Sequence, residues 1–127
     1  MTAEFDPTGL APHEPGAKLD AGKPLAGVLG EFGLALLEVA KVGTFGAEKY
    51  SRSGWQHVKD GAIRYNDAMW RHLLLEHVEA CAPDSGLLHE AHVAWNALAR
   101  LELKLRMRQT RPMLVANKPG NIATCPA

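Results

Sequence analysis

The sequence predicts an all-α protein built as a bundle of three helices. Apolar residues recur at helical spacing in three stretches, at residues 25–45, 61–80 and 86–107. No stretch alternates apolar and polar residues in the way that is typical of strands. Three helices make a thin core, so we expect a homo-dimer or homo-tetramer to complete the bundle.

The two ends of the chain are predicted to lie outside the bundle. Residues 1–24 are rich in Pro, Gly and Ala and contain the polar loop KLDAGKP at residues 18–24, so we expect an extended segment. Residues 25–109 are expected to form one helical, catalytic domain. The tail at residues 110–127 contains three prolines, and we expect it to be flexible or to drape over a partner.

Each predicted helix carries its own apolar stripe. The glycines at positions 30 and 33 weaken the first turns of the first helix, and the segment at residues 46–55 after it reads as a loop. Pro83 ends the second helix, and Asp84 or Ser85 caps the third. The stripes consist of Leu34, Leu37, Val42 and Phe45 in the first helix, Ile63, Ala68, Leu73, Leu75 and Val78 in the second, and Leu87, Ala91, Ala94, Leu98, Leu101 and Leu105 in the third.

Composition and missing motifs exclude several classes of function. The formal net charge is zero, which argues against nucleic-acid binding. No apolar run is long enough to span a membrane, and the N-terminus has no signal-peptide pattern. The two cysteines have no metal-binding spacing, so we expect a cytoplasmic protein without a disulfide. The phosphate-binding loop, the dinucleotide-binding fingerprint and the serine-hydrolase elbow are all absent.

Three polar residues share one face of the third predicted helix. His89, His92 and Asn96 fall within roughly 60° of each other around the helix axis. Burying such groups without partners costs a few kcal/mol each. A histidine pair at this spacing can bind one metal ion, and the amide can hold a ligand. Alternatively, each group makes an internal polar contact between helices.

Glu38 lies among apolar residues on the first predicted helix. A carboxylate there needs a cation, so it is a candidate ligand for Mg²⁺ or Mn²⁺, or a base that activates water. The alternative is an ion pair with Lys41 or with an arginine of a neighbouring helix.

The second predicted helix carries another polar group. Asp67 and Arg71 are four residues apart and can pair along the helix. Otherwise Asp67 can bind a metal, and the planar guanidinium of Arg71 can hold a phosphate. His72 and Glu76 form a further pair at this spacing, more typical of a surface.

A lysine and two aromatic residues lie close together in the segment after the first helix. Lys49 offers a charge for phosphate, and Tyr50 and Trp55 offer rings for stacking on a base. Alternatively, Trp55 anchors this segment against the core.

Five motifs occur in a fixed order over residues 18–102. They are KxDxGKP at 18–24, EVAKVxTFGAxKY at 38–50, Trp55, YxDAxxRHL at 65–73 and DSGLxHxxHxxxNAL at 84–98. Together they resemble the phage dATP/dGTP diphosphohydrolase family, which is similar to the all-α MazG-like nucleotide pyrophosphohydrolases. Each motif is short, but five motifs in the same order form a specific pattern.

The resemblance implies a fold, a reaction and a set of residue roles. The fold is an oligomeric helical bundle of the MazG-like type, and the reaction is hydrolysis of a purine deoxynucleoside triphosphate, dGTP or dATP, to the monophosphate and pyrophosphate. Two or three Mg²⁺ or Mn²⁺ ions assist. The implied catalytic residues are Glu38, His89 and His92; the implied substrate-binding residues are Lys23, Phe45, Lys49, Trp55, Arg71, His72 and Asn96; and the implied metal ligands are Glu38, Asp67, Asp84, His89 and His92.

The chain departs from the wider MazG-like pattern, which has ExxE on one helix and ExxD on the next. Here Glu38 is followed at the third position by Lys41, and the second pair is His89 and His92. Mg²⁺ prefers oxygen ligands, so the histidines can instead contact phosphate or water.

Two other functions remain open alternatives. One is a non-catalytic helical interaction protein whose polar stripe lies between subunits. The other is a histidine-aspartate phosphohydrolase that removes all three phosphates together, although the adjacent His-Asp pair of that family does not occur in the chain.

Overall fold

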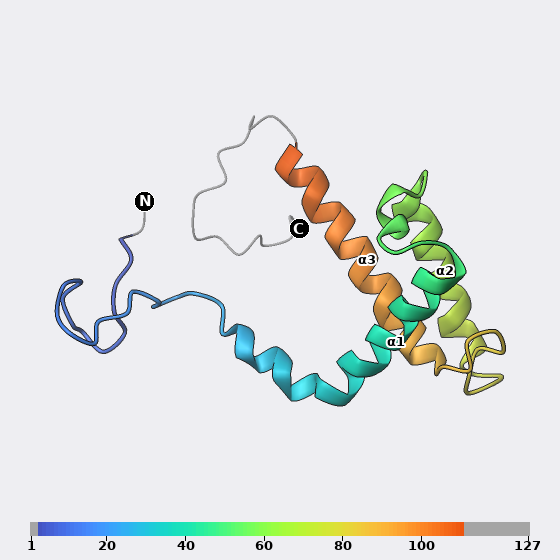
Figure 1. The fold of residues 1–127 in the computed structure, drawn as a ribbon, viewed down its shortest axis with the longest axis horizontal. Coiled ribbons are helices and arrows are strands. Elements are labelled where there is room, and N and C mark those ends of the chain that lie inside the picture. The colour runs from blue at the N-terminus through green and yellow to red at the C-terminus, as the bar shows by residue number, and fades with distance from the viewer. Residues whose placement is uncertain (1–2, 111–127) are drawn as a thin grey trace. The chain divides into compact units, whose positions relative to one another are not determined.

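A computed structural model describes residues 3–110 and confirms the all-α class (Figure 1). Within these residues, β-pairing is limited to one isolated antiparallel bridge, between Cys81 and Leu88. None of the described helices is long and apolar enough to cross a membrane. In chain order, the elements are the 3₁₀ helix η1 (Ala26–Phe32), α1 (Gly33–Lys49), the 3₁₀ helix η2 (Gly54–His57), α2 (Gly61–Leu75) and α3 (His89–Thr110).

The described residues belong to two compact units that divide between Val28 and Leu29. The N-terminal unit consists of turns and loops up to η1. The Asp6 carboxylate closes its main loop by accepting hydrogen bonds from the backbone and hydroxyl of Thr8 and from the backbone of Lys18. These hydrogen bonds, led by that of the Thr8 hydroxyl, lower the pKa of Asp6.

The first helix begins and ends later than the sequence predicts. Its first residues form the 3₁₀ turns of η1, where glycines disfavour a regular α-helix. It then continues to Lys49, so residues 46–49 are helical and their prediction as a loop is wrong. The physical reason is packing. Val42 is buried, and Gly43 lies so close to α3 that a Cβ there would be 3.1 Å from Nε1 of Trp95.

The predicted end of the second helix and the predicted start of the third are wrong, because a backbone turn separates α2 from α3. α2 ends at Leu75 rather than at residue 80, and α3 begins at His89 rather than at residue 86. Within the turn, Ala82 N–H donates to the Leu87 carbonyl at 2.8 Å, and His89 N–H donates to the Ala80 carbonyl at 3.1 Å. These tertiary hydrogen bonds occupy backbone groups that either helix would need in order to extend.

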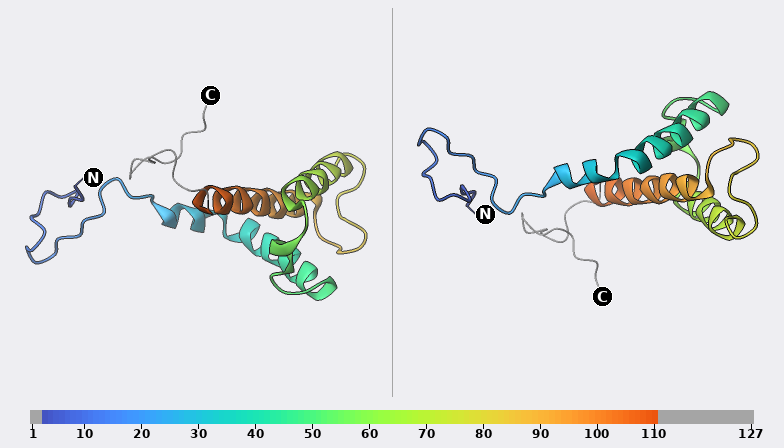
Figure 2. Two further views of the ribbon diagram at one scale, coloured as in Figure 1. Left: turned by 90° about the horizontal axis from the view of Figure 1, so that it is seen from above. Right: turned by 90° about the horizontal axis from the view of Figure 1, so that it is seen from below.

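α3 is the central helix of the C-terminal unit, with α1 and α2 packed against it (Figure 2). Trp55, Tyr65 and Trp95 form an edge-to-face aromatic cluster, with ring centroids 5.7–6.5 Å apart. The hydroxyl of Tyr65 donates to the Trp55 carbonyl at 2.7 Å. Trp55 therefore anchors the segment around η2 against α2 and α3, which is the alternative that the sequence left open.

The apolar core of one chain is small. Among the described residues, the buried apolar side chains are those of Val42, Ala82, Ala91 and Ala99. The buried residues of α3 also include His89, His92 and Asn96, so the predicted polar stripe does face inward.

Candidate functional site

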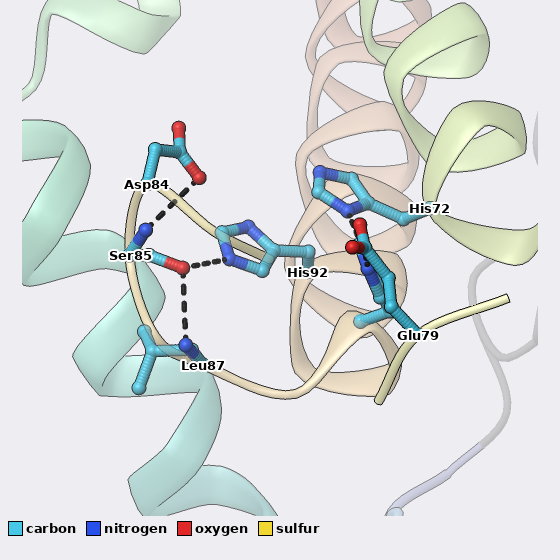
Figure 3. A network of polar contacts seen from close by, with 7 residues as sticks. His72, Glu79, Asp84, Ser85, Leu87 and His92 are labelled. Carbon is cyan, nitrogen blue, oxygen red and sulfur yellow. Dashed lines mark hydrogen bonds and ion pairs between the residues drawn. The ribbon is translucent and has the colours of Figure 1, made fainter. Parts of the chain in front are cut away.

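Polar side chains gather where the N-terminal end of α3 meets the turn before it and the end of α2. His72 comes from α2, Glu79 and Asp84 from the turn, and His89 and His92 from the first turn of α3 (Figure 3). We call these five residues the histidine cluster. Helical spacing alone brings His89 and His92 together, whereas the turn is what adds the two carboxylates.

His89 joins Glu79 to His72. Its side chain is fully buried, its Nε2 lies 3.2 Å from Oε1 of Glu79, and its Nδ1 lies 2.8 Å from Nδ1 of His72. A carboxylate can only accept, so with both rings neutral the proton of His89 is on Nε2 and its Nδ1 accepts from His72. The Nε2 of His72 then keeps a free lone pair.

His92 is held by the ring of His72 and by the turn. The rings of His72 and His92 stack with centroids 4.3 Å apart and an angle of 9° between their planes. Nε2 of His92 lies 2.7 Å from the hydroxyl oxygen of Ser85, and this oxygen also accepts the backbone N–H of Leu87 at 3.2 Å. Both histidines of α3 are thus oriented by contacts outside their own helix.

Burial and neighbouring rings lower the pKa values of His72 and His92. Burial, followed by the nearby rings of His92 and His89, lowers the pKa of His72 to about 4, although the Asp84 carboxylate opposes this shift. Burial also lowers the pKa of His92, again against the effect of Asp84. His72 is therefore a neutral imidazole at pH 7, able to accept a hydrogen bond at Nε2.

Folding stability is expected to fall as the pH drops from about 6.5 to about 4. In this window the unfolded chain protonates His72 and the folded chain does not. The free energy of unfolding should fall by about 1–2 kcal/mol, less than the full shift implies because the ring is only half-buried. Urea titrations of wild type and His72→Gln across this range measure the difference. His57→Gln, which changes an exposed histidine, is the control, and equal slopes for wild type and His72→Gln would contradict the prediction.

The end of α1 contributes a cation beside the cluster. Nζ of Lys49 lies 3.7 Å from Oδ2 of Asp84, and both side chains are about half-exposed. The ammonium also lies over the rings of Phe45 and Tyr50, 5.7 and 5.4 Å from their centroids. The structure therefore brings Phe45 and Lys49, two of the predicted substrate-binding residues, to the same side of the molecule as Asp84.

Glu38, Asp67 and Arg71 are not part of this hydrogen-bonded network. Glu38 pairs with Lys41, which is the alternative that the sequence left open, and it lies about 16 Å from Lys49 along the axis of α1. Asp67 and Arg71 are exposed on α2, and no ion pair between them occurs in the described structure. The guanidinium of Arg71 is thus available on the helix that supplies His72.

Three other predicted residues have mainly local contacts. Asn96 is buried one turn beyond His92 and donates to the carbonyl of that residue at 2.8 Å. Trp55 belongs to the aromatic cluster, with Arg106 over its ring at 5.6 Å. Lys23 belongs to the N-terminal unit, where it pairs with Glu4 at 3.2 Å.

The histidines predicted as metal ligands contact other protein groups in this arrangement. Both nitrogens of His89 are engaged by His72 and Glu79, and Nε2 of His92 is engaged by Ser85. Over residues 3–110, no three His, Cys, Asp or Glu side chains gather in a way that could hold a metal ion.

The parts played by Glu79 and the hydroxyl of Ser85 have no signal in the sequence pattern. Glu79 lies in the irregular segment after α2, where helical spacing carries no information about its neighbours. The sequence predicts Ser85 as a helix cap, but its hydroxyl instead orients His92. Every buried side-chain nitrogen and oxygen in the described residues has a hydrogen-bond partner.

Comparison with protein-family models gave one match, over residues 13–112, to a model described as "dATP/dGTP diphosphohydrolase, N-terminal". The matched range contains η1, all three α-helices and every residue of the histidine cluster. Searches of curated proteins and of solved structures gave no match.

Proposed function

This chain belongs to the dATP/dGTP diphosphohydrolase family, as a match to the N-terminal domain of that family, and from this premise we propose that it hydrolyses a purine deoxynucleoside triphosphate. The products are the monophosphate and pyrophosphate, and the substrate is dGTP, dATP or both. The observation that carries the proposal is the histidine cluster, a buried polar network beside exposed cations within the matched range.

The cations near the cluster suit a triphosphate. Lys49 and Arg71 supply two positive charges from different helices, and a planar guanidinium can bind two phosphate oxygens together. The free Nε2 of His72 can accept a hydrogen bond from water or from the sugar. Phe45 and Trp55 are the aromatic residues proposed to enclose the base, with Asn96 beside the sugar or base.

Hydrolysis requires water to attack the α-phosphorus while the bond from that atom to the bridging oxygen breaks. The hydroxyl joins the monophosphate, and pyrophosphate leaves. Glu38 is the proposed residue that orients this water or takes its proton. His89 has no exposed surface, so its proposed contribution is to position His72 rather than to touch the substrate. His92 similarly links His72 to the turn at Ser85.

We propose that a divalent cation enters the site bound to the substrate. A nucleoside triphosphate binds Mg²⁺ or Mn²⁺ by its own phosphate oxygens, and the ion neutralises charge on these oxygens. Glu38, Asp67 and Asp84 are the proposed protein ligands, because they offer the oxygen atoms that these ions prefer. Glu38 lies about 16 Å along α1 from Lys49, which pairs with Asp84, so Glu38 and Asp84 are proposed to hold different ions. The proposed setting is the cytoplasm, where deoxynucleoside triphosphates occur, and the proposed assembly is a homo-dimer or homo-tetramer.

The test is to incubate the pure protein with each of the four deoxynucleoside triphosphates and GTP, with Mg²⁺ or Mn²⁺, and to separate the products by ion-exchange chromatography. We expect monophosphate and pyrophosphate from one or two purine substrates. Nucleoside and triphosphate would instead indicate a triphosphohydrolase. An absence of turnover with either metal would favour the interaction protein, whose polar stripe needs no ligand because its groups are already paired.

Arg71→Ala is expected to raise the KM for the triphosphate about tenfold or more, because a charged hydrogen bond to phosphate is worth about 1.5–3 kcal/mol. The protein should remain folded, since Arg71 is exposed on α2. Arg64→Ala is the matched control, because Arg64 is also exposed and lies two turns earlier on this helix. Steady-state rates over a range of substrate concentrations measure the effect. Equal KM values for the two variants would remove Arg71 from the substrate site.

A further inference from the structure

Many large apolar side chains of one chain are exposed, whereas few are buried in its core. The exposed apolar side chains cluster on α1 before residue 38 and on the outer faces of α2 and α3. Isolated exposed apolar residues are normal, but contiguous patches mark sites of interaction. Those on α1 and the end of η1 are Leu29, Phe32, Leu34, Leu36 and Leu37.

An apolar groove runs between α2 and α3 on the side of α3 away from α1. Ile63 of α2 and Ala97, Leu101 and Met107 of α3 line it. At ~100° per residue, Ala97 and Leu101 lie on the opposite side of α3 from Trp95, the residue that contacts α1. The apolar groove is therefore not covered by the chain's own α1.

Positive charge predominates along this groove. Its lining includes Arg100 and Lys104, and no carboxylate is among the described residues that line it. In the described residues Lys104 has no ion pair. A partner for this surface must therefore combine apolar side chains with negative charge.

The segment at residues 29–37, which we call the apolar arm, combines apolar side chains with a negative charge. All of its residues are exposed, and its one charged residue is Glu31. It spans about 15 Å when helical, close to the length of α3 between residues 97 and 107. No basic residue occurs in it that would repel Arg100 or Lys104.

We propose that the apolar arm of one copy of this chain docks in the α2–α3 groove of a second copy, with Glu31 facing Lys104. Each copy gives its arm and receives the arm of the other. The complementary charges favour this pairing over contact of two grooves, which would bring like charges together. The proposal does not depend on hydrolysis, so it can fail or hold independently of the proposed function.

The test is a pair of charge reversals on the full chain, Glu31→Lys and Lys104→Glu, examined by sedimentation velocity over a range of concentrations. Wild type should sediment as a dimer or larger assembly. Each variant alone should show a dissociation constant raised about tenfold, because it places like charges opposite each other. An equimolar mixture of the two should regain an affinity within about twofold of wild type, since both contacts are then complementary.

Arg108→Glu is the matched control, because Arg108 is exposed on α3 but does not line the groove. It should assemble as wild type does, and circular dichroism should show equal helix content in all variants. A monomeric wild type would overturn the proposal, as would variants that assemble like the control. The proposal would also be overturned if each variant associates weakly and their equimolar mixture regains no affinity, because the groove would then have a different occupant.

Discussion

Glu38→Gln is expected to lower the turnover of dGTP or dATP by about two to four orders of magnitude, the usual contribution of general acid–base catalysis. The amide keeps the shape of the side chain but removes its charge and its basicity. The half-exposed Glu38 makes one ion pair, with Lys41, so the loss of folding stability should stay within about 1 kcal/mol. Initial rates at saturating substrate measure the effect, with circular dichroism as a check on the fold.

Two control variants separate catalysis from local structure. Glu48→Gln removes an exposed carboxylate from the other end of α1 and should leave turnover unchanged. Lys41→Ala removes the cation that pairs with Glu38 but not the carboxylate itself. If Glu38 serves only that ion pair, Glu38→Gln and Lys41→Ala will have equal and small effects. A rate near that of wild type would then exclude Glu38 from the mechanism.

His89→Ala is expected to lower the free energy of unfolding by about 3 kcal/mol, near the upper range for single substitutions. The ring is fully buried, and its removal leaves a cavity between Glu79 and His72. It also leaves both of these groups without their hydrogen-bond partner, which costs about 1–3 kcal/mol for each buried group and less for half-exposed ones. Urea denaturation at a fixed protein concentration measures the change, because assembly also affects stability.

His77→Ala provides the matched comparison for His89→Ala. His77 is exposed in the segment between α2 and α3, so its replacement should change stability by less than about 0.5 kcal/mol. A loss below about 1 kcal/mol for His89→Ala would mean that the buried network contributes little to the fold, since buried hydrogen-bonded groups ordinarily cost more than this to remove.

The number and type of helices could be predicted from local pattern, but their ends could not. Apolar residues at helical spacing identified three helices, because a helix buries one face whatever it packs against. Leu75 and His89 became helix boundaries because backbone groups from Ala80 to Leu87 pair across a turn. Lys49 became helical because Val42 and Gly43 pack the end of α1 against Trp95. Neither the backbone pairing across the turn nor the packing of α1 against Trp95 can be recognised within a short window of sequence.

By itself, the sequence determined the all-α class, the inward face of His89, His92 and Asn96, and the family, since ordered motifs and helical spacing are local properties of the chain. The tertiary structure decided the partners of these groups. His72 and Glu79 reach His89 from outside its helix, whereas Glu38 pairs within its own. Hydrogen bonds act over about 3 Å, so residues far apart in the chain become partners only when packing places them within that distance.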